Sequence, residues 1–116
     1  MFEMPKEQDW ICEHAERVVC VDIDGTITVG GPWKGEEQFS MVRPTARRAL
    51  VELRRRGYII VLHSVRKRKD LVYQWAKREG LDFDYIETKA YARYYIDDRA
   101  IGFRGSWLDV LQEVKT

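Results

Sequence analysis

The chain has 116 residues, a formal net charge of +1 at pH 7 and 45% hydrophobic residues, which indicates one ordinary globular domain spanning residues 1–116. The near-zero net charge excludes a general electrostatic attraction to nucleic acid or to anionic membranes. No apolar run approaches the roughly 18 residues that a spanning helix needs, and two cysteines are too few for a disulfide scaffold. The first residues, MFEMPKEQDW, do not resemble a signal peptide, so we expect a cytoplasmic protein without a membrane partner.

The first half of the chain predicts a buried strand followed by a flap. Residues 1–17 form an N-terminal extension, and the run VVCVDI at 18–23 is typical of a strand buried on both faces, with Cys20 as a buried thiol. Residues 25–43 hold most of the turn signals, and the Gly-Gly-Pro at 30–32 interrupts short β-like pieces. We therefore expect a β-hairpin flap over residues 25–43.

The second half alternates helices and strands. Apolar spacing and stop signals predict a helix from Pro44 to Gly57, a strand at 58–63, a helix at 68–79, a weak strand at 84–87, a strand at 94–97 and a last helix to about 115. Ser106 and Asp109 form a capping box at the start of that last helix. This alternation predicts a parallel sheet with crossover helices.

Polar residues follow the strands of this sheet at the ends where ligands bind in such folds. They are Asp22, Asp24, Ser64, Lys89, Asp97 and Asp98. Carboxylates that crowd together raise one another's pKa unless a cation neutralises them, and Mg²⁺ prefers oxygen ligands. With a serine and a lysine beside the acids, the edge suits a phosphate group.

The same residues, in the same order, resemble the motifs of the haloacid dehalogenase (HAD) superfamily of phosphotransferases. Its first motif matches Asp22-Ile23-Asp24-Gly25-Thr26, and its second, a serine or threonine ending a strand, matches Ser64. Its third, a basic residue, matches Lys89, and its fourth, an acidic pair, matches Asp97-Asp98 in YYIDDRA. The resemblance covers residues 18 to about 110 and departs at Ala90, where close relatives often carry proline.

The resemblance implies a covalent route of phosphate transfer. Asp22 would be the nucleophile, and Asp24 would be the general acid and then the base. Ser64 and Lys89 would hold the phosphoryl oxygens, Gly25 would let the chain turn and Thr26 could bond the phosphate. The cofactor Mg²⁺ would be held by Asp22, the backbone carbonyl of Asp24, and Asp97 or Asp98.

The resemblance also implies a three-layer α/β Rossmann-like fold with a central parallel sheet in the order of about 3-2-1-4. Too few residues lie between the motifs for a cap domain, so the chain resembles the capless branch. An open site admits a large phosphorylated substrate, or uses a neighbouring subunit of a homo-oligomer as a lid. The flap residues Trp33, Lys34 and Phe39 are the nearest candidates for substrate contacts.

The sequence therefore predicts a Mg²⁺-dependent phosphomonoester hydrolase of unknown substrate. Two alternatives stay open: a nucleic-acid end phosphatase or nucleotidase, and a non-catalytic phosphate-binding or interaction module. Ser64 could instead cap the next segment, and Lys89 could be a surface lysine. The basic runs 54–56 and 66–69 fit a solvated helix face better than a nucleic-acid site, because nearby acids balance them.

Overall fold

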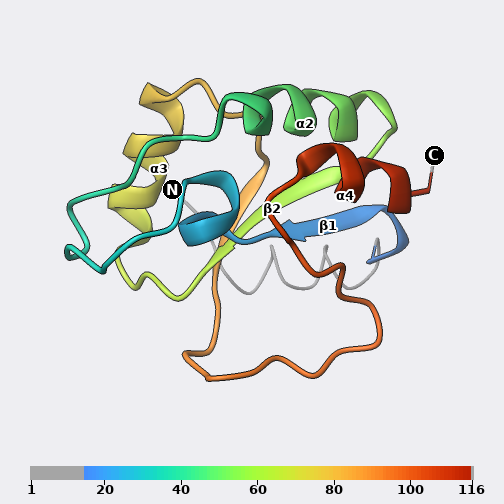
Figure 1. The fold of residues 1–116 in the computed structure, drawn as a ribbon. Helices are drawn as coiled ribbons and strands as arrows, with labels where there is room; N and C mark the ends of the chain where they lie inside the picture. The colour runs from blue at the N-terminus through green and yellow to red at the C-terminus, as the bar shows by residue number, and fades with distance from the viewer. Residues whose placement is uncertain (1–14, 116) are drawn as a thin grey trace.

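A parallel three-stranded sheet with the order β1-β2-β3 forms the centre of the molecule (Figure 1). The computed structural model describes residues 15–115, so most of the expected N-terminal extension lies outside the described residues. The strands are β1 (Val18–Val21), β2 (Ile59–Ser64) and β3 (Tyr85–Thr88), preceded by a short 3₁₀ turn, η1 (Ala15–Arg17). Val21 pairs with Leu62, and Leu62 pairs with Ile86, so the three carboxyl ends lie side by side.

Helices follow the strands as the sequence predicts. They are α2 (Pro44–Arg55), α3 (Lys69–Arg78) and α4 (Trp107–Glu113). Helix α2 packs against β2 and α4, and α3 packs against β3 (Figure 1). Ser106 caps α4 as expected, because its hydroxyl accepts the backbone N–H of Asp109 at 3.2 Å.

Helix α2 illustrates how the sequence sets an element. Pro44 occupies the first turn, where its missing N–H costs no hydrogen bond. The residues that α2 buries follow the i, i+3, i+4, i+7 spacing of one helix face: Ala46, Ala49, Leu50 and Leu53. Gly57 then takes φ +93°, a left-handed conformation that suits glycine, and the chain turns into β2.

The main cluster of the hydrophobic core lies on one face of the sheet, while Val61 of β2 is fully buried on the other face. From the strands it takes Val21, Ile60, Leu62 and Ile86, which the register places on the same side. Cys20 points to the other side and is exposed, so the expectation of a buried thiol in a strand covered on both faces is wrong. Within residues 15–115 no helix supplies the second covering layer that the three-layer expectation requires.

The expected fourth strand at 94–97 is also wrong in this structure. Residues 89–106 run without regular secondary structure between β3 and α4. Ile96 is 100% exposed and Tyr94 is largely exposed, so the apolar run that suggested a strand has no sheet partner. An apolar run this short is ambiguous by pattern alone, and the full order 3-2-1-4 is therefore not formed by the described strands.

The flap is a loop closed at its base rather than a β-hairpin. A single antiparallel bridge pairs Thr28 with Val42, and the N–H of Val29 donates to the carbonyl of Met41 at 2.9 Å. The residues between them have no paired strands.

Among the helices of residues 15–115, none is long and apolar enough to cross a membrane.

Candidate active site

The helical turn that follows β1 positions Asp22 and Asp24. The chain leaves β1 and enters η2 (Ile23–Ile27), a wide helical turn in which the N–H of Thr28 donates to the carbonyl of Ile23 at 3.0 Å. Ile23 and Ile27 are completely buried and anchor the turn in the core. Gly25 has φ +83°, which lets the backbone reverse directly after the two acids.

Lys89 and Thr26 converge on the carboxylate of Asp22. The Lys89 Nζ lies 3.8 Å from Asp22 Oδ1, and the Thr26 hydroxyl donates to Asp22 Oδ2 at 3.2 Å. Burial raises the pKa of Asp22, while Lys89 and Thr26 oppose that rise. The structure thus brings together three residues that the sequence assigned to one site.

Ser64 ends β2 beside them, but its side chain is buried. Its hydroxyl accepts the backbone N–H of Arg66 at 3.1 Å, which is the local capping role that the sequence left open. The backbone N–H of Lys89 donates to the Ser64 carbonyl at 2.7 Å and extends the β2–β3 pairing. Ser64 therefore holds the strand ends together, and a direct contact with phosphate stays a prediction.

Asp97 and Asp98 are not brought to this edge. Both are exposed in the irregular segment after β3, and Asp97 Oδ1 accepts the N–H of Arg99 at 2.8 Å. Among residues 15–115, no group of three or more His, Cys, Asp or Glu side chains could hold a metal ion. The expected four-acid metal set is thus not assembled, because the strand that was to carry its second half is not formed.

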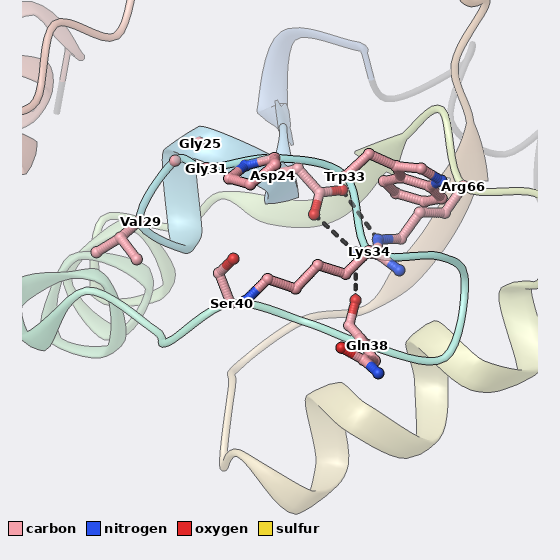
Figure 2. Close-up of a pocket in the computed structure, with 11 residues that line it drawn as sticks. Asp24, Gly25, Val29, Gly31, Trp33, Lys34, Gln38, Ser40 and Arg66 are labelled. Atoms are coloured by element: carbon pink, nitrogen blue, oxygen red, sulfur yellow. Dashed lines mark hydrogen bonds and ion pairs between the residues drawn. The ribbon is translucent and has the colours of Figure 1, made fainter.

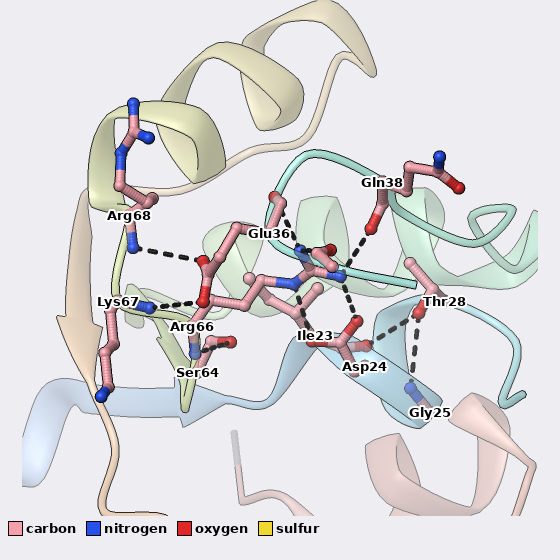
Figure 3. Close-up of polar contacts among 11 residues, drawn as sticks. Ile23, Asp24, Gly25, Thr28, Glu36, Gln38, Ser64, Arg66, Lys67 and Arg68 are labelled. Carbon is pink, nitrogen blue, oxygen red and sulfur yellow. Dashed lines mark hydrogen bonds and ion pairs between the residues drawn. The ribbon is translucent and has the colours of Figure 1, made fainter. Parts of the chain in front are cut away.

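Arg66 is the functional residue that sequence reasoning missed. It is only 3% exposed, and its guanidinium meets the carboxylate of Asp24 in a bidentate pair, with Nε–Oδ2 2.9 Å and Nη2–Oδ1 2.8 Å (Figure 3). It also donates to flap carbonyls, those of Gly35, Glu36 and Gln38. The solvated-face interpretation of the basic run is therefore wrong for Arg66.

Aromatic rings of the flap complete the surroundings of Arg66. Its guanidinium carbon lies 3.9 Å from the ring centroid of Phe39 and 4.7 Å from that of Trp33. Phe39 stacks in turn on Trp75 of α3, at 4.3 Å between centroids. Phe39 is thus a packing residue, whereas Trp33 remains 59% exposed and open to a ligand.

A pocket lies between the flap and the turn after β1 (Figure 2). Its volume is about 170 Å³, close to the roughly 150 Å³ of a cavity that holds one benzene ring. Asp24 and Arg66 form its inner wall, and Lys34 extends across it toward Ser40. The proposed acid–base residue therefore faces a space large enough for one small ring.

No sequence signal separated Arg66 from its neighbours. Its position two residues after Ser64 places it beside the strand end, but the run RKRK contains three other basic residues. Arg68, two positions further on, is exposed and pairs with Asp70 at 2.8 Å. Only the three-dimensional approach of the flap distinguishes the buried arginine from the solvated one.

Comparisons with known proteins support the fold and name no activity. No protein-family model and no curated protein matches the chain. A crystal structure from Vibrio cholerae is similar with a TM-score of 0.64 at 22% identity, covering 73% of this chain and 82% of that one. A conserved protein from Bacteroides thetaiotaomicron is similar with a TM-score of 0.58 at 26% identity, covering 85% and 92%.

Proposed function

We propose that this chain is a phosphomonoester hydrolase of the HAD type that works through an aspartyl-phosphate on Asp22. The observation that carries the proposal is the ion pair between Asp22 and Lys89, at the edge where β1 and β3 end. A partly buried carboxylate beside a lysine suits a nucleophile that must approach an anionic phosphate. Lys89 would attract the phosphoryl oxygens that otherwise repel Asp22.

The proposed reaction has two steps, as the resemblance to the HAD superfamily implies. An oxygen of Asp22 forms a bond to phosphorus while the ester P–O bond breaks, and Asp24 gives its proton to the leaving oxygen. Water then attacks the same phosphorus, Asp24 takes a proton from it, and the bond between phosphorus and Asp22 breaks. Inorganic phosphate leaves, and both acids return to their starting states.

The donor set at the edge fits Mg²⁺ in part. Magnesium is usually held by one or two carboxylates plus water and substrate phosphate oxygens, and Asp22 with the backbone carbonyl of Asp24 could supply the protein's share. When bound, the ion would neutralise charge on the phosphoryl group. Asp97 and Asp98 are exposed elsewhere in this arrangement, so they supply no ligand to the ion in it.

The direct test is hydrolysis of 4-nitrophenyl phosphate by the purified chain. We expect turnover that stops with excess chelator and returns with Mg²⁺. Asp22→Asn should abolish turnover while circular dichroism and melting temperature stay close to wild type, since the amide has nearly the shape of the acid. In the wild type, beryllofluoride should form an adduct on Asp22 in a crystal.

Asp70→Asn is the matched control, because Asp70 is exposed and forms an ion pair with Arg68 rather than with a residue of the site. This variant should keep wild-type turnover. Near-normal kcat in Asp22→Asn would remove Asp22 as the nucleophile. Full activity in excess chelator would remove the metal from the proposal.

A non-catalytic phosphate-binding module is the second candidate. The exposure of Asp97 and Asp98 favours it, because a site with fewer acids repels a phosphate anion less. Such a module would bind inorganic phosphate through Lys89 and show no turnover of any phosphomonoester. Calorimetry with phosphate, run beside the hydrolysis assay, separates the two candidates.

A further inference from the structure

We propose that Arg66 is a positioning residue that ties the general acid–base Asp24 to the flap, and this inference rests on the proposed function. Residues of the flap would then take part in catalysis indirectly, by fixing the carboxylate that moves the proton. The contacts of one buried side chain carry the inference.

The hydrogen bonds of Arg66 use its full capacity. A guanidinium has five N–H donors in a fixed planar fork. In Arg66, Nε and one Nη2 hydrogen go to the two oxygens of Asp24, and the other donors go to the carbonyls of Gly35, Glu36 and Gln38. No donor is left for a substrate phosphate, so Arg66 acts through Asp24 rather than on the substrate.

The fork also fixes the orientation of Asp24. A bidentate pair holds the carboxylate plane, whereas a single hydrogen bond would leave it free to rotate. Each carboxylate oxygen has a second lone pair, so Asp24 can still exchange a proton with a leaving group on its pocket side. The side chain of Asp24 is 36% exposed and that of Arg66 is 2% exposed, which leaves only the acid open to substrate.

A second set of contacts holds the flap to the same segment. The side chain of Glu36 accepts the backbone N–H groups of Lys67 and Arg68, at 3.2 and 3.3 Å. Arg66 also lies against the rings of Trp33 and Phe39. The flap, the loop after β2 and Asp24 thus form one connected unit, in which Arg66 is the common member (Figure 3).

The test compares two substrates that differ in their need for a proton. The leaving group of 4-nitrophenyl phosphate departs without one, whereas that of an alkyl phosphate such as ethyl phosphate requires one. General acid catalysis is worth about 10²–10⁴-fold. Because kcat/KM reports the first step, in which the leaving group departs, Asp24→Asn should lose that factor in kcat/KM on the alkyl substrate and far less on the aryl one. Arg66→Gln should show the same selective loss in kcat/KM, at least about tenfold.

Two further variants separate positioning from general damage. Arg66→Lys should not rescue the loss, because an ammonium has no planar fork. Arg66→Gln combined with Asp24→Asn should be no worse than Asp24→Asn alone, since both act on one step. Arg68→Gln is the matched control and should leave both substrates unaffected. Equal loss of kcat/KM on the two substrates, or additive losses, would overturn the proposal.

Limited proteolysis tests the link between Asp24 and the flap without a measurement of turnover, so it is informative even if the proposed function is wrong. Trypsin can cut after Lys34 in the flap, so Asp24→Asn should speed this cleavage by weakening the tie through Arg66, and Asp70→Asn should not. If the wild type hydrolyses neither substrate, the proposed function fails, while cleavage still decides whether Asp24 and the flap are tied. Unchanged cleavage in Asp24→Asn would refute the tie, even if neither Arg66 variant folds.

Discussion

The pKa of Asp22 is subject to opposing effects from its surroundings. Burial raises its pKa and favours the neutral acid, and the charge of Asp24 acts in the same direction. Lys89 is the largest influence in the other direction, followed by the hydrogen bond from Thr26. In the proposed mechanism only the carboxylate can attack phosphorus, so Lys89 would both attract the substrate and keep Asp22 charged.

Lys89→Ala should therefore impair catalysis strongly. Loss of one preorganised partner of the transition-state charge typically costs about 10²–10³ in kcat, and we expect a loss of that size on 4-nitrophenyl phosphate. Lys89→Arg keeps a positive charge and should retain part of the kcat that Lys89→Ala loses. The measurement is steady-state kinetics with saturating Mg²⁺.

Lys67→Ala serves as the control, because Lys67 is exposed and only its backbone contacts the flap. It should stay within a few-fold of wild type. A similarly small effect of Lys89→Ala would transfer the basic role to another residue, for which Arg93 and Arg99 in the following segment are the candidates.

Sequence reasoning found residues whose roles follow from the ends of strands. Asp22, Thr26 and Lys89 meet because parallel strands bring their carboxyl ends together, and that geometry follows from the pattern of strands alone. Arg66 escaped because its environment is built by a loop that folds back over it. A buried arginine inside a basic run has no local pattern that distinguishes it from exposed neighbours.

At the scale of elements, Arg56 joins the ends of α2 and α4. It follows the last turn of α2, and its Nη1 donates to the carbonyls of Leu111 at 2.7 Å and Val114 at 3.0 Å. These carbonyls belong to the C-terminal end of α4, where no further helical N–H can satisfy them. Arg56 thus fastens the short last helix to α2.

Arg56→Gln should lower the free energy of unfolding by about 1–3 kcal/mol, because it leaves the carbonyls at the end of α4 without their charged donor. Arg55→Gln is the matched control: its side chain is 69% exposed and pairs only with Glu52, against 14% exposed for Arg56. We expect that control to have a much smaller effect, because an exposed ion pair contributes little to stability. Urea unfolding followed by circular dichroism measures both, and equal effects would contradict the fastening role.

Acid should weaken the same helix end. Hydrogen bonds from Arg55 and Arg56 lower the pKa of Glu52 from 4.5 to about 2. Since the folded-state pKa lies below the unfolded one, the stabilisation is present above pH 4.5 and is lost as pH falls toward 2. The melting-temperature gap between wild type and Glu52→Gln should therefore shrink over that range, and a constant gap would count against this linkage.

Elements with a clear period were predicted well, and the weak strand predicted at 84–87 is present as β3, whereas the short apolar run at 94–97 forms no strand. The stripe of α2 and the cap of α4 follow from local spacing, and both are present. The residues at 94–97 have apolar character but no alternation, so nothing local decides between a strand and an exposed loop. Residues 94–97 would form a strand only if they paired with β1, and that contact depends on how the whole chain folds.

For the whole molecule, balanced charge argues against a polynucleotide substrate. In the basic run at 66–69, Arg66 is buried and Arg68 pairs with Asp70. Lys69 lies 4.0 Å from Glu87. Three of the four basic side chains in this run are thus buried or lie near an acid, which leaves less free positive charge there to follow a phosphodiester backbone.

We therefore expect no preference for a 5′-phosphorylated oligonucleotide over a 5′-mononucleotide in kcat/KM. A backbone grip would release counterions and give a salt slope of about −0.7 per phosphate contact for a single strand. Measurement of both substrates at low and high salt checks the expectation. A strong oligonucleotide preference that collapses with salt and disappears in the Lys67→Ser, Arg68→Ser double variant would reverse the ranking.

The bridge between Thr28 and Val42 closes the base of the flap. Because the two ends of the loop already meet there, extra residues at its tip need not displace a strand or a helix. Each doubling of a flexible loop costs only about 0.6 kcal/mol of closure entropy. An open site of this design could thus gain a covering domain by insertion near Gly30 and Gly31, while the turn that carries Asp22 and Asp24 stays as it is.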